Sequence, residues 1–177
     1  MTTLEQRKNS LGFDLLASIR YHNYRIRFFE CWDRMSSVVA VVFGSSVMYN
    51  LSQQNTELAL YSGLFGTVLS ALALVVGFGQ RAREHRDFKM QFAQLEYRLS
   101  TEPLSEMLLK NLSAEVQLIN SKEPPPLIVL GEICHNEQVK AEGFDNEHLS
   151  QIAWYQRLFA HYVDLCPHKI FEKLDKM

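Results

Sequence analysis

The sequence lacks charge over one long stretch. Between residues 35 and 79 the only charged side chain is Glu57, although the chain of 177 residues carries 18 Lys or Arg and 20 Asp or Glu. A helix at the surface of a soluble core normally keeps a polar stripe for water. The absence of charge therefore separates a segment suited to lipid from two flanking segments suited to water.

Residues that build chemical sites are also scarce. The three cysteines, Cys31, Cys134 and Cys166, are odd in number and widely spaced, which argues against disulfides and fits a reducing compartment. Cys134 and the adjacent His135 diverge by about 100° on a helix, so a shared metal ion is the weaker interpretation. A Cys–His nucleophile pair is also the weaker interpretation, because nothing supplies an orienting third group or an oxyanion hole. The sequence has no glycine-rich phosphate loop and no HExxH motif. We expect no enzyme activity, no catalytic residue, no metal and no cofactor.

The balance of charge is close to neutral. The formal net charge is -2, and the C-terminal half has no basic stripe with interleaved aromatic residues. Such a stripe is the usual electrostatic mark of nucleic-acid binding. We therefore expect no direct nucleic-acid partner.

Two long uncharged runs are present instead. Residues 35–56 and 58–80 give about 22 and about 23 positions, enough for a helix to cross a hydrocarbon layer roughly 30 Å thick. The end of the first run is polar, so its membrane part is expected to stop near Leu51. A pair of buried helices in a soluble protein is the alternative, but such helices are usually shorter or have a polar face.

The positions of the cations predict the orientation of these runs. The connection between the runs, residues 52–57, has no Lys or Arg. The flanking cations are Arg20, Arg25, Arg27 and Arg34 before the first run, and Arg81, Arg83, Arg86 and Lys89 after the second. By the positive-inside rule, both termini are expected in the cytoplasm and the lipid bilayer is the first partner.

Small side chains recur at four-residue spacing in both runs. They are Ser36, Ala40 and Gly44 in the first, and Ser62, Gly66 and Ser70, followed by Ala73 and Gly77, in the second. Lipid gives apolar helices no hydrophobic reason to associate, so close approach through small residues supplies the attraction. This packing could lie within one hairpin or between protomers, and we expect a homo-oligomer. In a ring of protomers the candidate pore-lining residues are Ser45, Ser46, Tyr49 and Asn50.

Amphipathic helices are predicted on both flanks of the hairpin. Residues 11–34 form one that runs into the first span. After the second span, Phe88, Phe92, Leu95 and Leu99 follow one helical stripe, which we interpret as a cytosolic interface. Its expected partner is the first amphipathic helix, in a stalk; a seam between subunits is the alternative.

The remaining sequence also predicts helices. Apolar positions from Leu104 to Ile119 indicate one helix, three prolines at 124–126 a rigid connection, and residues 127–142 another helix ended by Gly143. Asp145 or Asn146 is the expected cap of a final helix that reaches about Cys166.

The predicted fold is thus all-α, a two-helix transmembrane hairpin with long cytosolic helical extensions that form a stalk or bundle. Its predicted parts are a cytosolic amphipathic helix (1–34), the hairpin (35–80), the following cytosolic helices (81–123) and a C-terminal cytosolic helical region (124–177).

Two segments carry a family likeness. The helix register FKMQFAQLEYRL and the later EPPPLIVLGEICHNEQVKAEG, together with the two spans, resemble the SLATT-type two-transmembrane effector domains of bacterial defence systems. The likeness covers residues 10–143. It implies an oligomeric, pore-forming or membrane-disrupting effector at the bacterial inner membrane, in antiviral defence, that is triggered by a separate cytosolic sensor protein.

Two other functions compete with this expectation. A non-catalytic membrane anchor or scaffold would use the stripe from Phe88 to Leu99 and the final helix to recruit a cytosolic partner. A holin-like protein shares the two spans but usually lacks so large a cytosolic portion.

Overall fold

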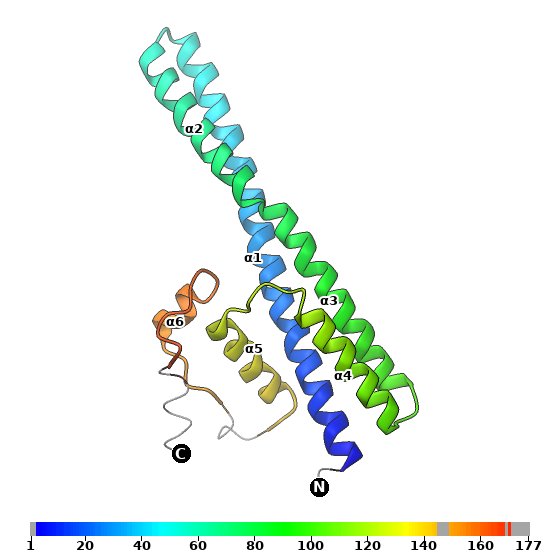
Figure 1. Cartoon of the computed structure of the whole chain (residues 1–177). Helices are drawn as coiled ribbons and strands as arrows, with labels where there is room; N and C mark the ends of the chain where they lie inside the picture. The colour runs from blue at the N-terminus through cyan, green and yellow to red at the C-terminus, as the bar shows by residue number, and fades with distance from the viewer. Residues whose placement is uncertain (1–2, 145–148, 169, 171–177) are drawn as a thin grey trace. The chain divides into compact units, whose positions relative to one another are not determined.

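The computed structural model describes residues 3–144, 149–168 and 170, and its regular elements are helices (Figure 1). In chain order these are α1 (Leu4–Ser52), α2 (Thr56–Val76), α3 (Phe78–Thr101), α4 (Glu106–Asn120), α5 (Ile128–Ala141) and α6 (Trp154–Phe159). No strand occurs among the described residues. The predicted all-α class is confirmed.

The chain divides into two compact units. The first, here called the span unit, is Arg25–Glu84; the second, the core unit, combines Met1–Tyr24 with His85–Met177. Helix α1 contributes to both units because it continues without a break from Leu4 to Ser52. The segments predicted as separate cytosolic parts on either side of the hairpin therefore belong largely to one unit.

The span unit contains the two long apolar helices. By length and composition, α1 and the helical stretch that begins with α2 could each cross a membrane. None of the residues in the most apolar window of α1 is buried, and 11% of those in the second window are. A core helix of a soluble protein would be mostly buried, so these helices do not fit that alternative within this chain.

A short turn joins α1 to α2. Gln54 adopts a positive φ of 58°, and the Asn55 side chain caps α2 by accepting a hydrogen bond from the Leu58 amide at 3.3 Å. Asparagine favours this cap position because its side-chain oxygen satisfies an amide that the first helical turn leaves open. The first helix therefore ends at Ser52, close to the predicted polar end of the first run.

The second apolar run contains a helix break that the sequence analysis did not predict. Gly77 has φ +65° and ends α2, and its amide donates to the Ala73 carbonyl at 3.0 Å. Glycine is favoured in this left-handed cap because it has no Cβ to clash with the backbone. Arg81 Nε then donates to the Val76 carbonyl at 3.0 Å. Gly77 is thus a helix cap, and residues 58–80 are not one helix.

The core unit buries the apolar stripe of α3. Phe92, Leu95 and Leu99 are at most 5% exposed, and Phe88 packs against the same cluster. The other buried members come from α1 and α4: Leu15, Leu108, Leu109, Leu112 and Ile119. The predicted contact with the first helix is present, and α4 is a further partner. Because this stripe is covered within the chain, it is not an exposed surface for recruiting another protein.

Helix α5 and the C-terminal segment form a second cluster in the core unit. Helix α5 covers nearly the predicted range, and Gly143 follows it with φ +77°. The start of α5 is capped from a distance, because the Asp164 carboxylate accepts from the amides of Ile128 at 3.0 Å and Val129 at 2.9 Å. A buried cluster that includes Val129, Leu130 and Ala160 lies beside this cap.

The final helix is much shorter than predicted. Helix α6 ends at Phe159 instead of near Cys166, and the predicted cap at Asp145 or Asn146 lies outside the described residues. Gln156 Nε2 donates to the carbonyls of Leu165 and Cys166 at 2.9 and 3.1 Å. A buried glutamine that satisfies these carbonyls supports an irregular segment where the local pattern favoured helix.

Candidate membrane-spanning site

The two helices of the span unit contact each other through small and aromatic side chains. The hydroxyls of Ser46 on α1 and Ser62 on α2 lie 3.2 Å apart. The rings of Phe43 and Phe65 have centroids 5.0 Å apart. A Cβ added at Gly66 would lie 2.8 Å from Phe43 Cβ, closer than real Cβ atoms approach. Gly66 is therefore required for the observed contact between the helices.

Aromatic contacts extend this pairing toward the charged ends of the helices. The Trp32 and Phe78 rings stack with centroids 5.9 Å apart. On α1 the Arg25 guanidinium lies 4.5 Å from the centre of the Phe29 ring, a favourable cation–π distance. Both contacts lie within the span unit, outside the uncharged runs or at their ends.

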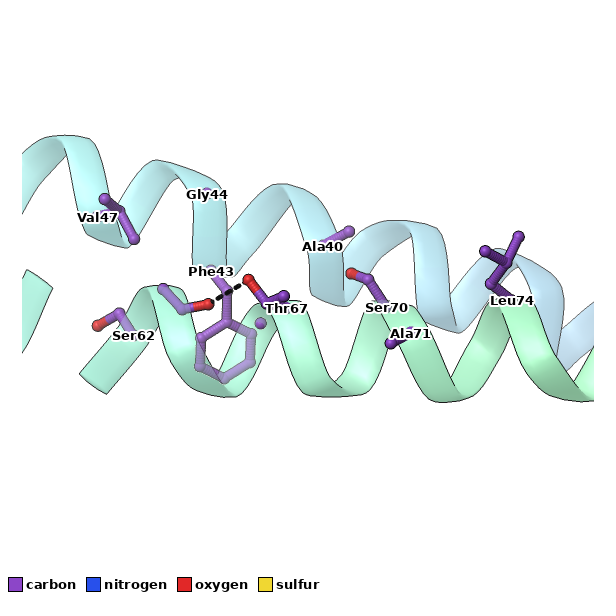
Figure 2. A pocket seen from close by; sticks show the side chains of 11 residues that line it. Ala40, Phe43, Gly44, Val47, Ser62, Thr67, Ser70, Ala71 and Leu74 are labelled. Carbon is purple, nitrogen blue, oxygen red and sulfur yellow. Dashed lines mark hydrogen bonds between the residues drawn. The ribbon is translucent and has the colours of Figure 1, made fainter. Parts of the chain in front are cut away.

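An open groove of about 590 Å³ runs along the paired helices (Figure 2). Its lining is mostly small or aliphatic: Ala40, Phe43, Gly44, Val47, Ser62, Gly63, Gly66, Thr67, Ser70, Ala71 and Leu74. A Cβ added at Gly44 would meet no atom within 4 Å. Among the residues that the structure describes, no side chain therefore covers α1 at Gly44.

The six predicted helix-packing residues divide between two roles. Five of them line the open groove, namely Ala40, Gly44, Ser62, Gly66 and Ser70. Of these, Ser62 and Gly66 also make the contact between α1 and α2. The sixth, Ser36, lines a neighbouring polar pocket, and its hydroxyl donates to the Asp33 carbonyl at 2.8 Å. A helical stripe of small residues cannot distinguish these roles, since both require close approach.

The four candidate pore-lining residues do not share one face. Asn50 Nδ2 donates to the Ser46 carbonyl at 2.8 Å, and the Ser46 hydroxyl contacts Ser62, so this pair is used inside the hairpin. Tyr49 is 66% exposed and Ser45 is exposed. The two pairs occupy adjacent faces because neighbouring helix positions diverge by about 100°. Of the four, Ser45 and Tyr49 are the ones whose side chains are exposed.

Burial suppresses the reactivity of the Cys134 thiol in the core unit. Cys134 is 1% exposed, and burial raises the pKa of its thiol to about 12, with a further rise from Glu137 and a partial opposing effect from Arg20. Cys31 and Cys166 are exposed. A protonated, buried thiol is a poor nucleophile and a poor metal ligand, so Cys134 is a packing residue.

Two buried histidines were missed by the sequence analysis. His22 on α1 and His85 on α3 are 1% and 7% exposed and contact each other in the core unit. The spacing of the apolar stripe indicates that His85 is buried. It stands three residues before Phe88 and seven before Phe92, at a core position of that stripe. The predicted stripe should have been extended backward to include it.

Comparison of the chain with models of protein families, with curated proteins and with solved structures finds no match.

Proposed function

We propose that this chain is a membrane-embedded effector that oligomerises and permeabilises the bacterial inner membrane when triggered, in defence against phage. The trigger is a separate cytosolic sensor protein. The observation that carries the proposal is the small-residue groove between two apolar helices, left open by the chain itself.

Exposed apolar side chains support a place in lipid for the span unit. Leu74 and Val75 are both 84% exposed, and Val41 is 68% exposed. Leaving such surface in water costs roughly 25 cal/mol for each Å² of apolar area, and a continuous patch of it marks a membrane or protein interface. The cations outside the two runs favour both termini in the cytoplasm.

The groove supports association between protomers. In a bilayer, helices attract one another mainly through tight packing, which requires small residues at the point of closest approach. Gly44 offers such a point because no atom of the described part of the chain would lie within 4 Å of a Cβ placed there. A ridge of side chains from a second protomer fits there. The absence of Asp, Glu, His, Lys and Arg within either uncharged run argues for a poorly selective opening over a proton relay or ion pump.

A scaffold is the second candidate function, and one observation favours it. Around the short α6, Trp154, Leu158 and Tyr162 are 78%, 62% and 54% exposed. Tryptophan and tyrosine are enriched in protein-binding surfaces. A scaffold would use this surface, since the stripe of α3 is buried.

Membrane potential tests the proposal directly. Wild-type protein, Gly44→Leu and the control Val42→Phe are produced at matched membrane levels, each fused to a domain that a small molecule clusters, as a substitute for the sensor. We expect clustering to depolarise cells that carry the wild type or Val42→Phe, since Val42 is outside the groove. Gly44→Leu fills the groove and should not depolarise.

Two results would contradict the proposal. Intact potential in clustered wild-type cells would exclude permeabilisation, and capture of one dominant partner that is lost in Trp154→Ala would then support the scaffold. Equal depolarisation by Gly44→Leu would show that the groove has no part in the opening.

A further inference from the structure

A polar pocket continues the groove of the span unit beyond its uncharged part. This pocket, of about 490 Å³, shares Ala40, Ser70 and Leu74 with the groove (Figure 2), so the two form one continuous cleft. The pocket adds side chains that can bind polar groups: Asp33, Ser36, Ser37, Gln80 and Arg83. The cleft is therefore polar at the pocket and mostly small or aliphatic along the groove.

The polar pocket presents one negative and one positive group. Asp33 lies on α1 and Arg83 on α3, and both side chains are exposed. Among the described residues neither charged group has an ion-pair partner, and the two do not pair with each other. The hydroxyls of Ser36 and Ser37 donate to the Asp33 backbone carbonyl, at 2.8 and 3.0 Å, so they leave its carboxylate open to a ligand.

Gly79 makes room for the Asp33 carboxylate. A Cβ added at Gly79 would lie 3.0 Å from Oδ1 and 3.4 Å from Cγ of Asp33. The carboxylate therefore lies against bare backbone near the start of α3, on the element that also carries Arg83. An acid and a base from two different helices thus line one pocket.

The cleft matches a phospholipid in length and in polarity. On α1 its lining passes through Asp33, Ser37, Ala40, Gly44 and Val47, which share one face because they are three or four residues apart. The helix rises about 21 Å from Asp33 to Val47 at 1.5 Å per residue. The hydrocarbon of one leaflet is roughly half of a 30 Å layer. An acyl chain therefore fits along the groove when its headgroup is in the polar pocket.

We propose that this cleft binds one ethanolamine phospholipid. Its ammonium contacts the Asp33 carboxylate, its phosphate contacts the Arg83 guanidinium, and one acyl chain lies along Ala40 and Gly44. Hydrogen bonds between ionised groups of this kind are about twice as strong as neutral ones. The inference deepens the proposed function, and it rests on the placement of the span unit in a bilayer.

The two charges distinguish the common headgroups. A primary ammonium carries three N–H donors, as a lysine side chain does, and can pair with the Asp33 carboxylate. A choline headgroup is positively charged but has no N–H to donate. A glycerol headgroup has no positive charge, so its phosphate would bring an uncompensated negative charge near Asp33. The pocket therefore favours ethanolamine over both.

The lipid and a second protomer compete for the groove. Gly44 is the proposed point of closest approach between protomers, and the acyl chain of the bound lipid covers it. A ligand shifts an equilibrium toward the state that it binds better. The bound lipid therefore favours the separate protomer, and oligomerisation requires its release.

Each charged group also has a simpler role. Asp33 could only stabilise the first turn of α3, where a negative charge is favourable. Arg83 could only anchor the helix near the headgroups, as flanking cations commonly do. Neither role gives a preference among headgroups that depends on Asp33, so lipid preference separates these roles from the proposed site.

Native mass spectrometry of the full chain tests the site. The protein is released from nanodiscs with equal amounts of phosphatidylethanolamine, phosphatidylcholine and phosphatidylglycerol that carry the same acyl chains. We expect wild type to retain phosphatidylethanolamine several-fold more than either other lipid. Asp33→Asn should retain phosphatidylethanolamine and phosphatidylcholine about equally, because the charge that attracts the ammonium is gone. Arg83→Gln should retain less of all three, because they share the phosphate.

Matched controls make the same changes of charge outside the pocket. Glu57→Gln and Arg34→Gln lie in the span unit and should keep the wild-type preference. Asp33 and Arg83 are exposed, so their substitutions leave no buried cavity and the variants should fold. Equal retention of the three lipids by wild type, or an unchanged preference in Asp33→Asn, would overturn the proposal.

Failure of the site and failure of the proposed function give different results. Equal retention by wild type removes the site but leaves a chain embedded in lipid, whereas recovery of the chain from the aqueous fraction without lipid contradicts both. A preference for phosphatidylethanolamine in a chain that does not depolarise cells keeps the site and removes permeabilisation.

Crosslinking tests the competition for the groove. Oligomers of wild type should be several-fold more abundant in phosphatidylcholine bilayers than in phosphatidylethanolamine bilayers, and Asp33→Asn should show no such difference. Equal crosslinking of wild type in the two bilayers would overturn the competition.

Discussion

The span unit and the core unit use the same residue types in opposite ways. In the core unit Leu112 is fully buried and Phe92 is 1% exposed, whereas in the span unit Leu74 and Val75 are 84% exposed. Each arrangement is favourable only in its own surroundings, since apolar surface is stabilised by leaving water, whether for a protein core or for lipid. The difference indicates that the two units are suited to different surroundings, the span unit to lipid and the core unit to water.

Glycine shows the same contrast inside the span unit. Gly66 is enclosed by Phe43, whereas Gly44 faces an open groove. Identical residues at similar spacing thus perform different tasks, one in holding the hairpin and one in leaving a surface open. Paired substitutions test both differences, one pair at Gly66 and Gly44 and the other at one leucine in each unit.

The largest effect is expected from truncating the core. Leu112→Ala should lower the free energy of unfolding by about 2–5 kcal/mol, because it leaves a cavity among buried side chains. Leu74→Ala should change it by less than about 0.5 kcal/mol, as expected for an exposed position. Denaturant unfolding of both variants in one detergent would measure the difference, and similar losses would contradict the contrast between the units.

The next largest effect is expected at Gly66. Gly66→Leu should destabilise the hairpin by about 1–3 kcal/mol, because the new side chain overlaps Phe43. Gly44→Leu should leave hairpin stability nearly unchanged and reduce crosslinked oligomers. Thermal unfolding and crosslinking in membranes separate these outcomes, and equal destabilisation by the two variants would show that the groove is not open.

A smaller effect is expected at the cap of α5. Asp164→Ala removes the carboxylate that accepts from two amides at the start of this helix. Loss of a helix cap costs about 0.5–2 kcal/mol. Hydrogen exchange should show faster exchange in the first turn of α5, whereas the exposed control Asp87→Ala should leave it unchanged.

The smallest effect on stability is expected from ionisation of Cys134, but its reactivity toward alkylation should differ clearly from that of the exposed cysteines. Since burial raises the pKa of this thiol to about 12, alkylation at neutral pH should modify Cys31 and Cys166 and spare Cys134. The unfolded thiol ionises first, from about pH 8.5, so the stability that the protonated thiol supplies is lost between there and about pH 12. Mass spectrometry of alkylated peptides checks this, and rapid labelling of Cys134 in folded protein would contradict its burial.

The features predicted correctly from the sequence are those with local signals. The stripe of α3, the prolines before α5 and Gly143 after it each depend on neighbours within a few turns, and the structure confirms them. The break at Gly77 was missed, because a glycine within an apolar run fits helix packing as well as a left-handed cap. Both uses exploit the missing Cβ.

Other features depend on contacts between distant residues. After the short α6, Gln156 donates to the carbonyls of Leu165 and Cys166 in an irregular segment, and Asp164 of that segment caps α5. The pairing of His22 with His85 joins positions 63 residues apart. In the candidate site, the sequence located the small residues but could not separate Gly66 from Gly44, since only the neighbouring helix distinguishes a filled face from an open one.

The most direct test of the account compares spin labels at Leu74→Cys and Trp154→Cys in nanodiscs, in a background without the native cysteines. Both positions are highly exposed, at 84% and 78%, one in each unit. Relaxation by dissolved oxygen reports lipid, and relaxation by a water-soluble nickel chelate reports water. We predict a dominant oxygen effect at position 74 and a dominant nickel effect at position 154. A dominant nickel effect at position 74 would place the span unit in water and contradict a membrane-embedded effector.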